Sequence, residues 1–144
     1  MTDALRFRPA TEADIPAMSR IRIAVRENRL SDPTRITEAM YRDHLGPLGR
    51  SWVAELGGEV IAFSSAARAD ASIWALFTDP AHEGLGAGKQ LLQLAVDWLF
   101  SEGAQEVQLG TAANTRADRF YAAQGWQRQA MRNEIEVEYR LPRP

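Results

Sequence analysis

Residues 114–126 read NTRADRFYAAQGW, and this stretch constrains the fold more than any other part of the chain. Its apolar positions predict an amphipathic helix that buries Ala117, Phe120 and Tyr121. Gly125 ends that helix, because glycine readily adopts the left-handed conformation that commonly follows a last turn. Any amphipathic helix packed on a core would show the same pattern. The segment indicates a particular fold only in combination with the glycine-rich segment that precedes it.

A glycine-rich segment, residues 80–89 (PAHEGLGAGK), lies upstream between a predicted strand and a predicted helix. Its alternate glycines, Gly84, Gly86 and Gly88, allow a tight turn and leave backbone N–H groups uncovered by side chains. The start of a helix adds the partial positive charge of the helix dipole. The segment therefore predicts an anion site suited to phosphate, although a ligand-free strand-to-helix connection would also account for the glycines alone.

Two common nucleotide-binding motifs do not fit this segment. The P-loop requires a glycine where Glu83 stands and a hydroxyl where Gln90 stands. The dinucleotide motif requires a third glycine where Lys89 stands. A nucleotide-binding protein is therefore disfavoured.

Hydrophobic periodicity predicts the other elements. The Gly57-Gly58 pair between two apolar runs predicts a hairpin, and the mostly apolar run 72–78 predicts a strand buried on both faces. We expect strands at 5–8, 51–56, 59–64, 72–78, 106–109, 126–132 and 134–141, and helices at 11–29, 34–45, 85–103 and 115–124. The order β-α-α-β-β-β-α-β-α-β-β indicates one α/β domain over residues 1–144, with a mixed central sheet flanked by helices on both faces.

In this order, the two segments resemble the GNAT acetyltransferase superfamily. The family's glycine loop, Gln/Arg-x-x-Gly-x-Gly/Ala, aligns with residues 83–88, and its later motif is similar to residues 114–126. Residues 76–80 look like the end of the family's fourth strand, and residues 7–14 look like its opening segment. The resemblance covers essentially the whole chain and implies a GNAT-like fold and an acetyl-CoA-dependent N-acetyltransferase.

The resemblance also implies which residues bind acetyl-CoA, the acetyl donor. The glycine loop would bind the CoA pyrophosphate, and the backbone of the preceding strand would bind the pantetheine arm and the thioester. Leu76 would donate its N–H to the oxyanion, and Tyr121 aligns with the tyrosine that serves the departing thiolate as an acid or hydrogen-bond donor. The implied cofactor-binding residues are Leu76, Phe77, Thr78, Glu83, Gly84, Leu85, Gly86, Ala87, Gly88, Lys89, Asn114, Arg116 and Tyr121.

Glu83 departs from the family pattern, because a carboxylate stands where Gln or Arg is usual. A carboxylate near a pyrophosphate is repulsive unless it points away or pairs with a cation. Lys89 or Arg116 could supply that positive charge. We therefore expect a weakened or redirected contact rather than a lost site.

The sequence identifies neither the general base nor the acceptor. Candidates for the base are Glu27, Glu55, Asp70 and Asp79, each of which also fits a solvated surface position. His82, a lone histidine in the glycine loop, fits a phosphate neighbour or a surface residue. In this superfamily the first two helices usually wall the acceptor site, and here they carry several arginines, including Arg22, Arg26 and Arg29. These arginines permit an acceptor bearing a carboxylate or a phosphate, and Trp74 could line its pocket.

The composition narrows the function further. The chain has no cysteine and two distant histidines, so we expect no disulfide, no cysteine nucleophile and no metal site. A net charge of −2 does not indicate a nucleic-acid surface. The apolar runs fall far short of the roughly 20 residues of a membrane span, and the first residues lack a signal-peptide pattern, so we expect a cytoplasmic protein.

Direct transfer of acetyl from acetyl-CoA to a primary amine of a small molecule or peptide is the leading interpretation. The alternative is a non-catalytic acyl-CoA binding or sensing module of the same fold. Tyr121 and Asn114 favour catalysis. The sequence leaves open whether the chain forms a homodimer.

Overall fold

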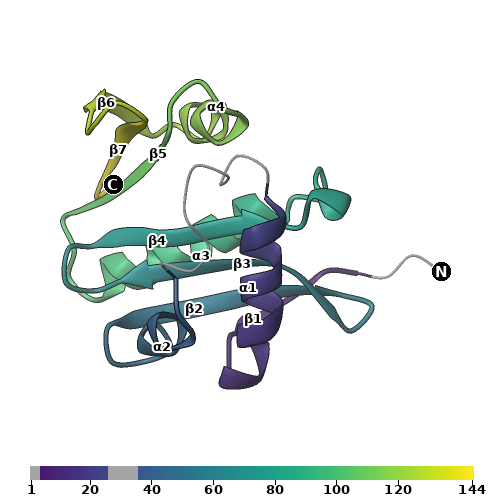
Figure 1. Ribbon diagram of the computed structural model, residues 1–144. Coiled ribbons are helices and arrows are strands. Elements are labelled where there is room, and N and C mark those ends of the chain that lie inside the picture. The colour runs from purple at the N-terminus through teal and green to yellow at the C-terminus, as the bar shows by residue number, and fades with distance from the viewer. Residues whose placement is uncertain (1–3, 26–35) are drawn as a thin grey trace.

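The computed structural model of the chain describes residues 4–25 and 36–144. Within these residues a seven-stranded sheet runs in the order β1-β2-β3-β4-β5-β7-β6, with helices on both faces (Figure 1). The strands are β1 (Arg6–Pro9), β2 (Gly49–Leu56), β3 (Glu59–Ala67), β4 (Ser72–Thr78), β5 (Glu106–Ala112), β6 (Gln127–Met131) and β7 (Glu136–Pro142). The helices are α1 (Ile15–Ala24), α2 (Glu38–Asp43), α3 (Ala87–Ser101) and α4 (Arg116–Ala123), with 3-10 turns η1 (Glu12–Asp14) and η4 (Pro80–His82). The predicted mixed sheet and its order of elements are confirmed.

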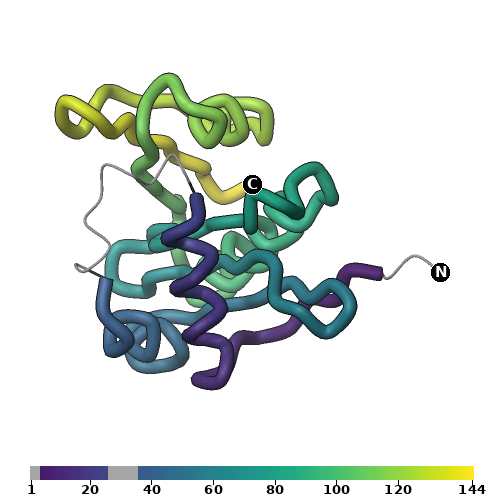
Figure 2. Tube along the Cα trace, turned by 45° about the vertical axis from the view of Figure 1, so that its right-hand side comes forward, coloured from purple at the N-terminus to yellow at the C-terminus, as the bar shows by residue number. Residues whose placement is uncertain are grey.

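The sheet has two parts that separate at one seam. All neighbouring strands pair antiparallel except β4 and β5, which are parallel. That parallel contact has a single register pair, Ser72 with Gln108, after which the two strands diverge. We call β1–β4 the first arm and β5, β7, β6 and α4 the second arm, which stands apart from the first in Figures 1 and 2.

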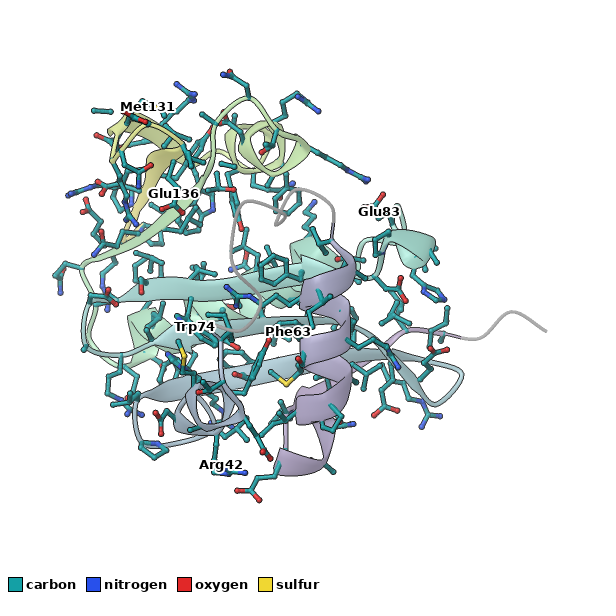
Figure 3. The ribbon with its side chains drawn as sticks, viewed as in Figure 1. Arg42, Phe63, Trp74, Glu83, Met131 and Glu136 are labelled. Carbon is teal, nitrogen blue, oxygen red and sulfur yellow. The ribbon has the colours of Figure 1, made fainter. Side chains whose placement is uncertain are left out.

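Two clusters of buried side chains hold the helices to opposite faces of the sheet. Helix α3 packs on one face through an apolar stripe, in which Leu91, Leu92, Ala95, Val96 and Leu99 are all buried. Helices α1 and α2 cover the other face and bury Met18, Ile21, Tyr41 and Phe63. Phe63 and Trp74 lie on the α1 side in Figure 3.

The first helix is shorter than the expected range 11–29. Thr11 opens the turn η1, in which the Asp14 carboxylate accepts hydrogen bonds from the Thr11 N–H and from Arg8 at 2.8 Å each. Helix α1 begins only after this turn, and Val25 is already extended. Residues 26–29 of the expected helix lie outside the described residues.

Two other expectations need correction. Helix α2 spans Glu38–Asp43 rather than 34–45, because Thr37 caps it by accepting the Met40 N–H; residues 34 and 35 are not described. Strand β4 is not buried on both faces, since Trp74 and Leu76 are only half-buried. The reason is that β4 borders the space between the two arms.

Candidate active site

A β-bulge in β4 accompanies the separation of the arms. Ser65 of β3 pairs with Ala75, but the next residue, Ala66, pairs with Ile73, so Trp74 has no partner on β3. A bulge of this kind bends its strand and increases its twist. Strand β4 therefore turns away from β5 beyond its first residues.

The bend leaves backbone groups of β4 facing the gap. The Asp79 N–H donates to the Ile61 carbonyl on β3 at 2.8 Å. Because N–H groups alternate sides along an antiparallel strand, the Phe77 N–H also points to β3, and those of Leu76 and Thr78 point away from it. The amides of Leu76 and Thr78 can therefore face a pantetheine arm in the gap, as expected. The Phe77 amide cannot, because it is turned to β3, although Phe77 itself lines the cavity.

A cavity of about 850 Å³ occupies the space between the arms. Among the described residues, its walls are formed by Arg22, Val25, Ile36, Met40, residues 73–78, 82–89, 109–112 and 115–117, and Phe120, Tyr121, Asn133, Ile135 and Glu136. Almost all of the predicted cofactor-binding residues are therefore brought together. Asn114 is the exception, because it is exposed and is not part of this lining.

The glycine loop lines the cavity at residues 82–89. Gly84 and Gly86 have φ angles of 81° and 83°, a left-handed conformation that favours glycine. The first hydrogen bond of α3 runs from the Gln90 N–H to the Gly86 carbonyl. The preceding N–H groups of Ala87, Gly88 and Lys89 thus have no partner within the helix, the arrangement that helix starts offer to anions.

Glu83 pairs with Arg116, one of the two cations anticipated for it. The Arg116 guanidinium donates to the Glu83 carboxylate, and both side chains are substantially exposed. The pair links the loop before α3 to the start of α4, hence the first arm to the second. The negative charge of Glu83 is thereby partly neutralised at the place where a pyrophosphate would bind.

Tyr121 lies in the cavity wall with its ring packed among other aromatic rings. The ring centroids of Phe120, Trp126 and Tyr139 lie 5.3, 5.8 and 5.8 Å from that of Tyr121. The residue is 6% exposed, and burial raises the pKa of its phenol well above the ordinary value. Tyr121 therefore keeps its proton through the neutral range and has an O–H group to donate there.

Asp118 fixes helix α4 to the rest of the second arm. Its buried carboxylate accepts two hydrogen bonds from Arg128 at 3.1 Å and further bonds from the Tyr139 hydroxyl and the Asn114 N–H. The Arg128 guanidinium holds the pKa of this carboxyl far below its usual range. Asn114, at a φ of 63°, therefore serves to shape the start of α4, about two helical turns before Tyr121.

Glu136 is a cavity residue that the sequence did not single out. Val137 and Tyr139 are fully buried with the α3 cluster, so alternation along β7 directs Glu136 to the face that α1 covers. Asn133 holds the turn before it, accepting the Glu136 N–H at 2.7 Å and donating to its carboxylate at 3.3 Å. Figure 3 shows Glu136 on the β7 side and Glu83 on the η4 side of the space between the arms.

The carboxylates expected as candidates for the base do not line the cavity where the structure describes them. Glu55 pairs with Arg8, Asp70 accepts from the Ser72 hydroxyl, and Asp79 caps η4; none of these acids lines the cavity. Glu27 lies outside the described residues. His82 does line the cavity, with its Nδ1 atom 3.4 Å from an Asp79 carboxylate oxygen.

Of the two arginines that α1 carries, Arg22 lines this site and Arg20 does not. Arg26 and Arg29 lie outside the described residues. The Arg22 guanidinium lies 5.4 Å from the Trp74 ring centroid and 5.0 Å from that of Phe77. Burial lowers the pKa of Arg22, an effect that the nearby Tyr41 partly offsets. Trp74 also stacks on His44 with centroids 4.1 Å apart, so it is a packing residue as well as a lining residue.

Ion-holding clusters of side chains and long apolar helices are both absent from residues 4–25 and 36–144. No group of three or more His, Asp or Glu side chains is placed there to hold an ion. No helix in the same ranges has the length and apolar character needed to cross a bilayer.

Comparison with known proteins agrees with this geometry. The sequence profile of the acetyltransferase (GNAT) family matches residues 16–126. No curated protein sequence matches the chain.

Solved structures resemble the chain over nearly its whole length. Ard1 from Thermoplasma volcanium is 19% identical with a TM-score of 0.80, covering 96% of this chain and 97% of that one. The ribosomal-protein-S18-alanine N-acetyltransferase from Escherichia coli is 20% identical with a TM-score of 0.79, covering 96% and 94%. The putative acetyltransferase yncA from Salmonella typhimurium, solved with acetyl-CoA, is 21% identical with a TM-score of 0.74, covering 97% and 94%. At these identities the likeness shows the fold alone.

Proposed function

Because the chain belongs to the GNAT family of acetyltransferases, we propose that it moves the acetyl group of acetyl-CoA directly to a primary amine. One observation carries the proposal: the open backbone edge of β4, the glycine loop and Tyr121 all border one cavity. A structural relative, yncA, was solved with acetyl-CoA, which supports the choice of donor.

The donor would lie along the first arm. Its pyrophosphate would accept hydrogen bonds from the N–H groups at the start of α3, where the positive end of the helix dipole adds attraction. Its pantetheine arm would pair with the backbone of Leu76 and Thr78, in place of the β5 strand that has turned away. The thioester carbonyl would then meet the Leu76 N–H.

The acceptor amine must lose a proton before it can attack. At pH 7 an amine of pKa near 10.4 costs about 5 kcal/mol to deprotonate. Glu136 is the cavity carboxylate that is not paired with Arg116, and it would take this proton, directly or through a water molecule. The neutral nitrogen then forms a bond to the carbonyl carbon, and the Leu76 N–H stabilises the resulting oxyanion.

Collapse of the tetrahedral intermediate breaks the C–S bond and releases the CoA thiolate. Tyr121 would donate a hydrogen bond to that sulfur. A phenol is already a weaker acid than a thiol, and burial raises the pKa of Tyr121 further, so hydrogen-bond donation is favoured over complete proton transfer. The nitrogen loses its second proton as the intermediate collapses, and the thiolate takes up one proton from solvent. The products are therefore the amide and the free thiol of CoA.

The test combines binding with turnover. Acetyl-CoA should raise the melting temperature of the protein, whereas ATP and NAD at equal concentration should raise it much less. Free thiol should then appear when amines from a broad panel are added. A melting shift without thiol release from any amine would instead support the non-catalytic binding module, and no shift at millimolar acetyl-CoA would overturn both.

A further inference from the structure

Three polar side chains, which we call the polar cluster, are buried together and take no part in the reaction described above. They are His44, Ser51 and Ser65. The Ser51 hydroxyl donates to the His44 carbonyl at 2.9 Å, and the two serine hydroxyl oxygens lie 2.6 Å apart. Because Ser51 has a single O–H and uses it on His44, Ser65 must donate to Ser51. A buried cluster whose hydrogen bonds are satisfied internally holds the elements that carry it in one arrangement.

The polar cluster ends beside the bulge of β4. Ser51 pairs with Ser65 across β2 and β3, and Ser65 pairs with Ala75 across β3 and β4, so the three residues form one row across the sheet. Directly paired residues share a face of the sheet, and Ala75 packs on the face that α1 and α2 cover. Trp74, the next residue of β4, is the one without a partner on β3. The pair of serine hydroxyls therefore lies at the residue adjacent to the bulge.

His44 also contacts the bulged residue itself. Its ring stacks on the Trp74 ring, with centroids 4.1 Å apart and an angle of 8° between the planes. Its Nδ1 atom lies 2.8 Å from the Met40 carbonyl oxygen and donates to it, since a carbonyl can only accept, and this bond orients the ring. The Tyr41 ring meets the Trp74 ring edge-on at 5.6 Å, which places Trp74 beside α2 (Figures 1 and 3). His44 therefore contacts the bulge through its ring and the neighbouring row through its carbonyl.

The position of the bulge decides which backbone groups β4 offers to the donor. A bulge interrupts the ladder at one point, and backbone pairing alone does not fix which residue is the extra one. If the bulge lay beyond Leu76, Leu76 would stand opposite Phe63 in the place that Phe77 now holds. Its N–H would then turn to β3 and be lost to the thioester carbonyl.

We propose that the polar cluster holds the bulge at Trp74 and so keeps the Leu76 amide turned to the donor. The inference rests on the proposed function, because that function assigns the open β4 amides to the pantetheine arm and the thioester. The members of the cluster are positioning residues: none of them lines the cavity, so they act through β4.

The first measurement needs no acceptor. Calorimetric titration compares CoA with its nucleotide fragment, which carries the same phosphates and lacks the pantetheine arm. His44→Ala should weaken CoA binding about fivefold, the scale of one hydrogen bond, and leave binding of the fragment unchanged, because only the pantetheine arm uses the β4 amides. His44→Phe should restore most of the CoA affinity, since it keeps a ring to stack on Trp74.

Ser65→Ala and Ser64→Ala form a matched pair for the second measurement. The two serines are fully buried neighbours on β3, but the Ser64 hydroxyl donates to the Leu91 carbonyl of α3 at 3.0 Å, on the opposite face of the sheet. Both variants should lose similar stability in urea. Only Ser65→Ala should change the ratio of CoA to fragment affinity and lower kcat, by about tenfold, on any amine that the wild type acetylates.

The outcomes separate this proposal from the proposed function. Equal losses of CoA and fragment affinity in His44→Ala, or an unchanged ratio in Ser65→Ala, would overturn the proposal and leave the polar cluster as core packing. The same change of ratio in Ser64→Ala would overturn it too, because any buried hydroxyl of β3 would then suffice. Where His44→Ala does not fold, the serine pair decides. If the wild type acetylates no amine, the proposed function fails while the affinity ratios still test the cluster, and a wild type that does not bind CoA would overturn both.

Discussion

Arg116, at the start of α4, forms an ion pair with Glu83, 33 residues earlier in the loop before α3. The pair ties the two arms of the split sheet together beside the start of α3, where we propose that the pyrophosphate binds. The pair also directs part of the positive charge of Arg116 to Glu83 instead of to the phosphates of a bound donor. Glu83, the unusual acidic residue of the glycine loop, is thus paired with a cation of the second arm.

Replacing Glu83 should strengthen donor binding. Glu83→Gln removes a negative charge near the pyrophosphate and leaves the Arg116 charge to act on it, so acetyl-CoA affinity should rise about fivefold, or roughly 1 kcal/mol. Arg116→Gln should weaken binding by a similar factor. Calorimetric titration at low and high salt measures both, and the differences should shrink in salt. Weaker binding by Glu83→Gln would mean that the pair instead positions the loop.

Gly86→Val should weaken acetyl-CoA binding at least tenfold. A Cβ at this position meets no protein atom within 4 Å, so the added side chain would occupy the space at the start of α3 where the pyrophosphate must approach. Binding of acetyl-CoA followed by melting temperature or calorimetry measures the effect.

Gly103→Val is its matched control. Gly103 follows α3 as Gly86 precedes it, also has a positive φ, of 100°, and its added Cβ likewise meets no atom within 4 Å. Both variants should lose stability through backbone strain of about 1–3 kcal/mol. Where valine prevents folding, the alanine pair gives the same comparison. Equal affinity in the two variants would place the donor elsewhere.

Glu136→Gln should lower kcat about 100-fold without changing acetyl-CoA affinity, if its carboxylate takes the amine proton. The loss should shrink as pH rises toward the pKa of the amine, because the acceptor then arrives already neutral. Glu134→Gln is the control, since Glu134 lies in the same turn, exposed and outside the cavity lining. A pH-independent loss would make Glu136 a binding group rather than a base.

Asp118→Asn should destabilise the protein by about 2 kcal/mol at pH 7, the scale of lost hydrogen bonds to a charged group. For a domain of this size the melting temperature should fall by roughly 6 °C. The folded-state pKa of Asp118 is depressed below its ordinary 3.8, so its stabilisation is complete above that value and declines as pH falls below it. Urea unfolding at pH 7 and pH 3 should show the gap between wild type and variant narrowing at pH 3.

The sequence predicted those parts of the site that lie close together along the chain. The glycines of residues 84–88 and the buried face of residues 117–121 have local signals, and both segments line the cavity. The length of the first helix was wrong because Thr11 opens a 3-10 turn, an alternative that helical periodicity does not distinguish.

Features that depend on strand register could not be read from the sequence. The bulge at Trp74 appears only when β3 and β4 are paired, and it determines which β4 amides face the gap. The alternation of apolar and polar residues along β7 predicts that Glu136 and Val137 face opposite sides of the sheet, but it does not predict which side borders the cavity. Asn114 matches the first position of the family's later motif. Its backbone N–H nevertheless donates to the Asp118 carboxylate, and the residue does not line the cavity.

Tyr121→Phe removes the hydroxyl while keeping the ring and its contacts with Phe120, Trp126 and Tyr139. If the hydroxyl donates to the departing thiolate, kcat should fall about 100-fold or less with acetyl-CoA affinity nearly unchanged, because the bond strengthens only as charge develops on sulfur. Rates must be measured under conditions in which chemistry limits turnover, with circular dichroism confirming that the variant folds.

The pH profile of Tyr121→Phe gives a second readout. Burial raises the pKa of Tyr121 well above its usual value of 10, so the hydroxyl keeps its proton throughout pH 7–10. The ratio of wild-type to variant rates should therefore be constant over that range, and the wild type should show no alkaline decline from this group. A ratio that falls toward 1 near pH 9–10 would mean that the phenol ionises there, and equal kcat at all pH values would leave Tyr121 as a packing residue, with the thiolate protonated by solvent.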